Sequence, residues 1–479
     1  MSVTVYDEAA PESIDHPSRS DPVVRGLSQV IGGPLGGHAA ARRRFWTASR
    51  VVLALVCLTL ALHWVQKSPC RDGAWQNLSQ YKYMCYTDVL ALYYNEGLSE
   101  GQVPYADHPV EYPVLTGAFM GLLGLPVHAY GAGDPGFNQG EAFYDLNALV
   151  LGALGVAAAA TILALRRRRP WDAAMFALAP ALFVSATVNW DLLAVALTGF
   201  FMWAWARRLP VLAGVLLGLA VAAKFYPLLL AGPLLLLALR TRRWAAPLTT
   251  VGVGAGTWLA VNLPIATAYP HAWLQFFRLN NTRGIDWGTF WYIGQHFPLG
   301  DSRYGLGLFA PLGNDVPLLN VWYFALFALA CLAIAVLAIR APRRPRFAQL
   351  AFLVVAAFLV TGKVWSQQYV LWLLPLAVLA RPRWGAFLAW QAAELCYFAA
   401  FYGELMGASG KQVFPEGVFV LAAILRLVTV CVLAGFVVHD ILRPRRDAVR
   451  DTYPDDPDGG VFDGAPDVGW VPRRELSSA

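Results

Sequence analysis

Long apolar runs recur along the chain from about residue 48 to residue 438, and each is long enough, or nearly long enough, to cross a lipid bilayer. Hydrophobic residues make up 57% of the chain and charged residues 14%, whereas soluble domains carry about 25% charged residues. The many Trp and Tyr residues are typical of proteins that contact both interfaces of a bilayer. The sequence therefore predicts an all-α, polytopic membrane protein.

The basic residues indicate the topology. The net charge of +6 does not indicate nucleic-acid binding, because the Lys and Arg residues fall in short clusters between apolar runs. We expect about twelve transmembrane spans. Their predicted ranges are 47–65, 145–165, 172–186, 188–206, 209–223, 226–239, 244–264, 316–339, 347–361, 369–380, 384–402 and 418–438.

One more apolar run, 112–126, is short and bounded by Pro113 and Pro126. If this run does not cross the membrane, the arginine clusters all lie on one side, which is the cytoplasm by the positive-inside rule. These clusters are 42–44, 166–169, 207–208, 240–243, 340–346, 381–383 and 443–446. We therefore expect an outer-leaflet helix at 112–126, cytoplasmic chain ends, and two outward-facing loops, 66–144 and 265–315.

The two ends of the chain differ from the rest in composition. Residues 1–41 are polar with Gly and Pro, and residues 443–479 are rich in Asp, Pro and Gly. We expect both to be disordered cytoplasmic tails that flank a transmembrane catalytic domain, 42–442. The first apolar run begins too late for a cleavable signal peptide, which favours a retained signal anchor.

Six cysteines are present, and four of them lie inside apolar runs without metal-ligand spacing. Cys70 and Cys85 flank part of the first outer loop. In an oxidising compartment they would form a disulfide, whereas elsewhere they would be free thiols, and the sequence leaves both possibilities open.

Unusual polar residues gather near the predicted outer ends of the spans, where ionisable side chains are functional candidates. The candidates are Asp88, Asp107, Glu111 and Tyr112 in the first outer loop, Asn189, Asp191, Lys224, Lys363, Gln367, Gln368 and Tyr369 at span ends, and Arg278 in the second outer loop. A Lys or Arg neutralises a phosphate, and a carboxylate acts as a general base towards an alcohol. Together they indicate transfer of a group from a lipid phosphate to a hydroxyl. The chain carries neither the P-loop pattern nor the dinucleotide-binding pattern of glycines.

Several segments resemble the multi-pass mannosyltransferases of glycosyltransferase family 87, which use polyprenyl phosphate mannose and have the GT-C fold. The segments are "YTDVLALYY", "PYADHPVEYPVL", "NWDLL", "KFYPLLL" and "WSQQYVLWLLP", and the resemblance covers roughly residues 45–440. The family includes enzymes that elongate phosphatidylinositol mannosides in mycobacteria. The family's Tyr-Pro step, often followed by a second Pro, is Tyr112-Pro113-Val114 here.

The resemblance implies an inverting hexosyltransferase at the outer face of a bacterial plasma membrane. In the family, the catalytic carboxylate follows the first span, which matches Asp88. The donor would be a polyprenyl phosphate sugar, the acceptor a glycolipid or glycan, and Lys224, Lys363 or an arginine of the second outer loop would hold the phosphate. The resemblance implies no cofactor and no obligatory metal.

Each assignment has an alternative. Asp107 or Glu111 would replace Asp88 as the base, or would merely order the turns before Pro109 and Pro113. Lys224 would extend to the interface, and Asn189 and Asp191 would cap a helix. A multi-pass lipid or glycan transporter is the alternative function, although we find no internal repeat typical of transporters.

Glu394 and Arg426 lie inside neighbouring spans, eight residues from the predicted outer end of each. Adjacent antiparallel helices would place the two side chains at one depth in the membrane. We therefore predict a buried, structural ion pair between them.

Overall fold

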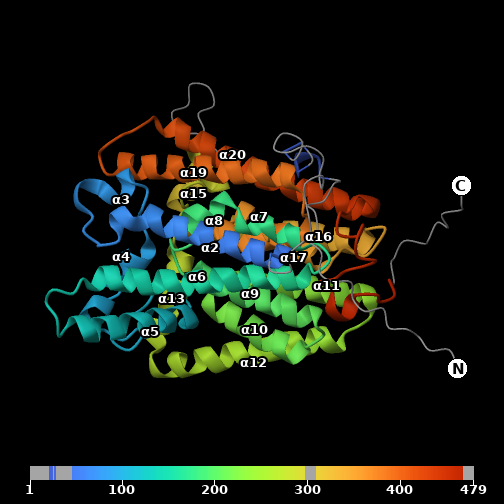
Figure 1. Cartoon of the computed structure of the whole chain (residues 1–479), viewed down its shortest axis with the longest axis horizontal. Helices are drawn as coiled ribbons and strands as arrows, with labels where there is room; N and C mark the ends of the chain where they lie inside the picture. The colour runs from blue at the N-terminus through green and yellow to red at the C-terminus, as the bar shows by residue number, and fades with distance from the viewer. Residues whose placement is uncertain (1–20, 25, 28–45, 297–308, 468–479) are drawn as a thin grey trace, which may run out of the picture.

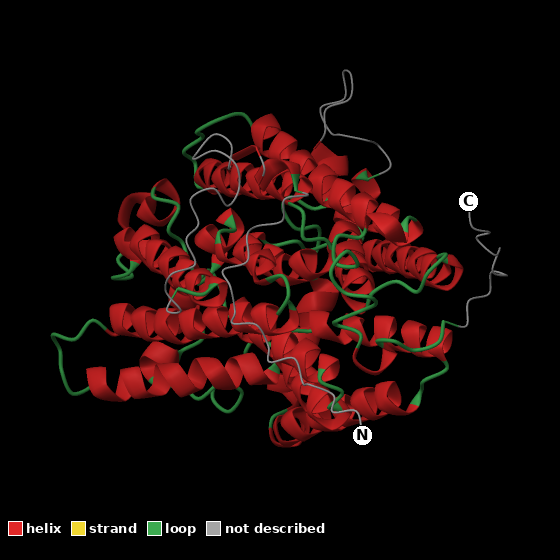
Figure 2. Ribbon diagram, turned by 45° about the vertical axis from the view of Figure 1, so that its right-hand side comes forward, coloured by secondary structure: helices red, strands yellow, loops and turns green. Residues whose placement is uncertain are grey.

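The computed structural model describes residues 21–24, 26–27, 46–296 and 309–467, and helices dominate this part of the chain (Figure 2). The first half of the chain forms α2 (Ala48–Lys67), α3 (Ser79–Lys82), α4 (Asp88–Asn95), α5 (Val114–Gly131), α6 (Gln139–Leu165), α7 (Ala174–Ala177), α8 (Pro180–Ser185), α9 (Asp191–Ala206) and α10 (Pro210–Ala223). The second half forms α11 (Ala231–Thr241), α12 (Ala245–Ala268), α13 (Pro270–Thr282), α14 (Phe290–His296), α15 (Ala310–Asn314), α16 (Val316–Arg340), α17 (Phe347–Thr361), α18 (Val370–Ala380), α19 (Trp384–Ala408) and α20 (Glu416–Leu442).

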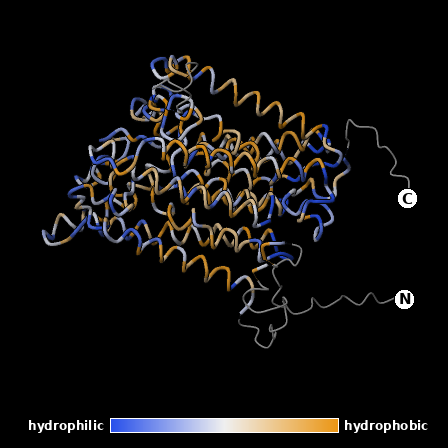
Figure 3. Tube along the Cα trace, turned by 90° about the horizontal axis from the view of Figure 1, so that it is seen from above, coloured by the Kyte–Doolittle hydropathy of each residue, from blue (hydrophilic) through white to orange (hydrophobic). Residues whose placement is uncertain are grey.

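The long helices run side by side, and hydrophobic residues fill the middle of the bundle while hydrophilic residues gather at its two ends (Figures 1 and 3). Within the described residues, six helices are long and apolar enough to cross a membrane: Ala48–Cys70, Val114–Gly131, Gln139–Leu165, Ala245–Ala268, Val316–Arg340 and Glu416–Leu442. Shorter apolar helices lie between them. The predicted all-helical fold is therefore confirmed over the described residues, and its long apolar helices are of the kind that cross membranes, whereas the count of about twelve spans stays a prediction.

Two predicted segments differ in the structure. The range 172–186 is not one helix, because Leu178 and Ala179 separate α7 from α8. The helix predicted to end near Pro126 continues through this proline to Gly131 and forms α5. A proline inside a helix is tolerated in membrane proteins when neighbouring groups compensate for the lost hydrogen bond. α5 packs beside the part of α6 that lies farthest from the C-terminal segment (Figure 1).

The segment 443–467 is not the disordered tail that its composition predicted. It packs across one end of the bundle and places buried aspartates against arginines of several clusters. Asp458 pairs with Arg166 at 2.5 Å, and both side chains are fully buried. Asp447 pairs with Arg346 at 2.7 Å. These contacts bring Arg166, Arg240 and Arg346, which belong to three different clusters, to the same segment. Most of the predicted N-terminal tail and residues 468–479 lie outside the described residues.

The predicted buried ion pair between the last two long helices is confirmed. Arg426 Nε lies 3.0 Å from Glu394 Oε2, and both side chains are buried. The guanidinium also donates hydrogen bonds to the backbone oxygens of Trp365 and Ser366. Arg426 thereby holds the chain that leads to Gln367 and Gln368.

Candidate active site

A cavity of about 660 Å³ lies where the short helices α3 and α4 meet the ends of the long helices. This volume falls within the range of about 300–1,000 Å³ that is typical of small-molecule sites. Its polar lining includes Tyr86, Asp88, Glu111, Tyr112, Asn189, Lys224, Arg283, Asp286, Gln367, Gln368 and Tyr369. Of the residues that the sequence predicted for the site, Asp107, Asp191, Arg278 and Lys363 do not line the cavity.

Asp88 is the first residue of α4, and it faces the beginning of α9. The side chain of Thr87 caps α4 by accepting from the backbone N–H of Val89 and donates its own hydroxyl proton to the Thr187 carbonyl at 2.6 Å. The backbone N–H of Asp88 donates to the Val188 carbonyl at 2.8 Å. These backbone contacts fix the carboxylate beside the segment that leads into α9.

The carboxylate of Asp88 accepts hydrogen bonds from neutral side chains. Its Oδ2 accepts from Asn189 Nδ2 at 2.7 Å and from Gln368 Nε2 at 3.4 Å, and the Tyr86 hydroxyl also donates to the carboxylate. Burial raises the pKa of Asp88 above its ordinary value, whereas these hydrogen bonds and the charges of Lys224 and Arg283 lower it. A carboxylate with a raised pKa accepts a proton more readily than an exposed one, as a general base must.

Lys224 lies at the end of α10, on the opposite side of Asn189 from Asp88. Its Nζ donates to Asn189 Oδ1 at 3.2 Å and lies 4.6 Å above the centre of the Tyr112 ring. Behind it, Asp191 is fully buried, lies 3.8 Å from Nζ and accepts from Trp372 Nε1 at 2.6 Å. Asp191 therefore lies behind the cation and, in contrast to its predicted place, does not line the cavity.

The arginine of the second predicted outer loop that reaches the cavity is Arg283, not Arg278. The cavity face of α13 carries Phe276, Leu279 and Asn280, which are spaced three and four residues apart. Arg278 belongs to the same helix, but it does not line the cavity and is exposed. Arg283 comes directly after α13, where the extended backbone turns the side chain back towards the cavity.

Lys363 does not line the cavity, in contrast to its predicted role. Its Nζ donates to the carbonyl of Arg283 and to Asn320 Oδ1, both at 2.6 Å, and to the carbonyl of Asn281 at 3.3 Å. The carbonyl of Lys363 accepts from the backbone N–H of Asp286 at 2.9 Å. Burial, followed by the positive charge of Arg283, lowers the pKa of Lys363 to about 8. Lys363 therefore fixes the loop that carries Arg283.

Asp107 and Glu111, the two alternative bases in the first predicted outer loop, lie in different surroundings. Asp107 is exposed and orders its own turn, because its Oδ2 accepts from the backbone N–H of Val103 at 2.8 Å. Glu111 lines the cavity, and burial together with the negative charge of Asp88 raises its pKa. Glu111 therefore remains a candidate to contact a substrate, and Asp107 does not.

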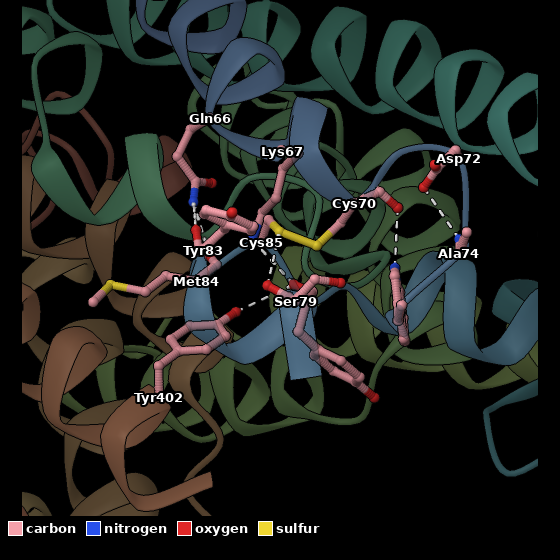
Figure 4. The surroundings of a disulfide bond; sticks show 12 residues. Gln66, Lys67, Cys70, Asp72, Ala74, Ser79, Tyr83, Met84, Cys85 and Tyr402 are labelled. Atoms are coloured by element: carbon pink, nitrogen blue, oxygen red, sulfur yellow. Dashed lines mark hydrogen bonds between the residues drawn. A yellow bond between two sulfur atoms is a disulfide. The ribbon is translucent and has the colours of Figure 1, made fainter. Parts of the chain in front are cut away.

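A disulfide joins Cys70 to Cys85, which settles the alternatives that the sequence left open. It ties the end of α2 to the segment three residues before Asp88 (Figure 4). Gln66 supports the same segment by donating to the backbone oxygen of Met84 at 2.8 Å. The position of Asp88 thus depends on cross-links between α2 and the loop that follows it.

Reducing this disulfide, or replacing Cys85 by Ser, is expected to lower stability by about 3 kcal/mol, the chain-entropy value for a closed loop of about 15 residues. The thermal unfolding midpoint in detergent should fall in the variant. Adding a reductant should lower the midpoint of the unaltered protein but should leave that of the variant unchanged. A reductant that lowers both midpoints equally would contradict this assignment.

Tyr86 has no place among the predicted site residues, whereas Arg283 is one of the arginines that the sequence offered in the second outer loop. Tyr86 stands two positions before Asp88, and its proximity in the sequence is the signal that would have indicated it. Arg283 lies in the segment Thr282–Asp286, where a Gly follows it and an Asp lies three residues later. This turn-like composition distinguishes Arg283 from Arg278, which lies within a helical pattern.

The model of glycosyltransferase family 87 matches residues 138–366, from the residue before α6 to the loop after α17. This range includes Asn189, Lys224 and Arg283, whereas Asp88 precedes it. No curated protein matches the chain. Over residues 138–366, just under half of its length, the chain is thus similar to glycosyltransferase family 87, and six of its described helices are long and apolar enough to cross a membrane.

Proposed function

We propose that this protein transfers a mannosyl or related residue from a polyprenyl phosphate sugar to a hydroxyl of a glycolipid or glycan. The observation that carries the proposal is the placement of the Asp88 carboxylate in one cavity with the cations of Lys224 and Arg283. A phosphate-linked donor needs cations at its leaving group, and an acceptor hydroxyl needs a base.

In the proposed reaction, the acceptor oxygen attacks the anomeric carbon of the donor from the side opposite the phosphate. The new carbon–oxygen bond forms as the bond from that carbon to the phosphate oxygen breaks, which inverts the anomeric configuration. The acceptor proton passes to Asp88, and the lipid phosphate leaves with the bonding electron pair. Lys224 and Arg283 stabilise the negative charge of the departing phosphate. Asn189 holds Asp88 and Lys224 in register, because it hydrogen-bonds to both.

The site belongs, in this proposal, to the outer face of a bacterial plasma membrane. The arginine clusters that contact segment 443–467 mark the cytoplasmic end. The Cys70–Cys85 disulfide lies close to the cavity in sequence and space, and disulfides persist in oxidising compartments. Both observations support an outward-facing cavity.

The proposed donor and acceptor are tested with purified protein in detergent. Radiolabelled polyprenyl phosphate mannose and a membrane lipid extract from mycobacteria are supplied together, and a new labelled glycolipid is expected. Omitting the lipid extract should remove the product. If proteoliposomes carry labelled lipid across the bilayer without consuming the donor, the protein is a transporter and the proposal is wrong.

A further inference from the structure

Lys67 is a buried cation near the candidate base, and it is absent from the predicted site residues. It is the last residue of α2, and its side chain is only 1% exposed. A lysine at the end of a membrane span commonly extends its ammonium to the aqueous interface. Here Nζ turns inward and donates to the backbone oxygen of Tyr86 at 3.0 Å.

Tyr86 connects this cation to the candidate base. Its carbonyl oxygen accepts from Lys67 and also from the Tyr402 hydroxyl of α19 at 3.2 Å. Lys67 and Tyr402 approach the segment around Cys85 from two different helices (Figure 4). The Tyr86 hydroxyl, in turn, donates to the carboxylate of Asp88, and Tyr86 lines the cavity. Tyr86 thus connects Lys67 and Tyr402, which contact its carbonyl, to Asp88, which accepts from its hydroxyl.

Burial makes the charged form of Lys67 costly, because an ammonium loses its hydration inside the protein. Asp88 is the carboxylate whose negative charge acts on Lys67. Lys67 is therefore a cation near Asp88 that does not line the cavity, whereas Lys224 and Arg283 do.

We propose that Lys67 is a positioning residue for the transfer reaction, which rests on the proposed function of Asp88 as the base. By holding the Tyr86 carbonyl, Lys67 keeps the Tyr86 hydroxyl directed at the carboxylate, and this hydrogen bond favours the ionised form of the base. Lys67 does not touch the substrate.

The acidity of Asp88 depends on every charged or titratable group that faces it. These groups are Tyr86, Lys67 and Tyr402 on the protein side, and Glu111, Tyr112, Asp191, Lys224 and Arg283 around the cavity. Losing the hydrogen bond from Tyr86 raises the pKa of the Asp88 carboxyl, because the ionised form loses stabilisation. The acidic limb of the activity profile should therefore move to higher pH.

Replacing Lys67 by Met is expected to lower kcat by about tenfold to a hundredfold, since misplacing a catalytic group by about 1 Å has effects of this size. The KM for the donor should change less, and the acidic limb of the kcat profile should move upward by about one pH unit. The measurement is the rate of labelled glycolipid formation between pH 5 and 9. Lys82→Met is the matched control, because Lys82 is an exposed lysine at the end of α3, and its profile should equal that of the unaltered protein.

A double-mutant cycle with Tyr86→Phe tests the route through Tyr86. If Lys67 acts through this residue, the double variant should be little slower than Tyr86→Phe alone, because neighbouring residues in one network are not additive. Should Lys67→Met fail to fold, Tyr402→Phe removes the second donor to the Tyr86 carbonyl and should shift the limb in the same direction. An unshifted limb in Tyr402→Phe would then overturn the proposal.

The outcomes separate this inference from the proposed function. If Asp88→Asn is inactive while Lys67→Met keeps the rate and the pH profile of the unaltered protein, the inference is wrong and the base assignment stands. If Lys67→Met lowers kcat without moving the acidic limb, Lys67 is structural only, and the inference is again wrong. If Asp88→Asn keeps full activity, the base assignment itself fails.

Discussion

Replacing Asp88 by Asn is expected to lower the transfer rate by about 10²–10⁴-fold, the range attributed to a positioned general base. The amide keeps the size of the side chain and can still accept from Asn189 and Gln368, which surround it in the cavity. It cannot take the acceptor proton. The measurement is the initial rate of labelled glycolipid formation at saturating donor, with donor binding measured separately on the same preparation.

Asp107→Asn provides the matched control for this change. Asp107 belongs to the same predicted loop, is exposed and orders a turn through Val103, a contact that an amide oxygen preserves. Its rate should equal that of the unaltered protein. A rate for Asp88→Asn within a few fold of that control would exclude Asp88 as the base and would make Glu111 the next carboxylate to test, because it also lines the cavity.

Replacing Asp458 by Asn is expected to destabilise the fold by about 3–5 kcal/mol, because removing one partner leaves a buried charge without compensation. Arg166 donates to the two carboxylate oxygens of Asp458 at 2.5 and 2.6 Å, and neither side chain is exposed. The neutral amide of an Asn at position 458 carries no negative charge to balance the Arg166 guanidinium. The thermal unfolding midpoint in detergent should therefore fall sharply, with loss of monodisperse protein.

Asp451→Asn tests whether the loss of stability expected for Asp458→Asn arises because Asp458 is buried. Asp451 lies in the same acidic segment but is exposed, so its replacement should change stability by no more than about 0.5 kcal/mol. Equal midpoints for the Asp458 and Asp451 variants would show that the segment contributes little to the stability of the bundle.

The sequence predicted the helices well because apolar length and charge clustering are local signals. The ranges 47–65, 316–339 and 347–361 correspond closely to α2, α16 and α17. The pairing of Glu394 with Arg426 was also predictable, since equal distances from the ends of two neighbouring helices place the side chains at equal depth.

Parts of the site were less predictable, because they depend on which way a side chain points. Arg278 and Arg283 lie five residues apart, yet only Arg283 follows the end of a helix and returns to the cavity. The sequence suggested that the ammonium of Lys363 was available to a substrate, but it donates to the carbonyls of Asn281 and Arg283, which are distant in sequence. Contacts of this kind depend on tertiary structure and leave no periodic pattern in the sequence.

The acidic end of the chain illustrates the same limit. Asp, Pro and Gly predict disorder when a segment is considered alone. Segment 443–467 is ordered because its aspartates pair with Arg166 directly after α6, with Arg240 in α11 and with Arg346 directly before α17. The amino-acid composition of one segment cannot show that a segment hundreds of residues away carries the complementary charge.

This arrangement has a consequence for biogenesis. Translation produces residues 447–467 after the α-helices of the bundle. Arg166, Arg240 and Arg346 therefore have no carboxylate partner from this segment until it has left the ribosome. Insertion of the helices into the membrane therefore precedes closure of their arginine-rich end. A nascent chain arrested before residue 447 would present unpaired guanidinium groups to chaperones and membrane proteases.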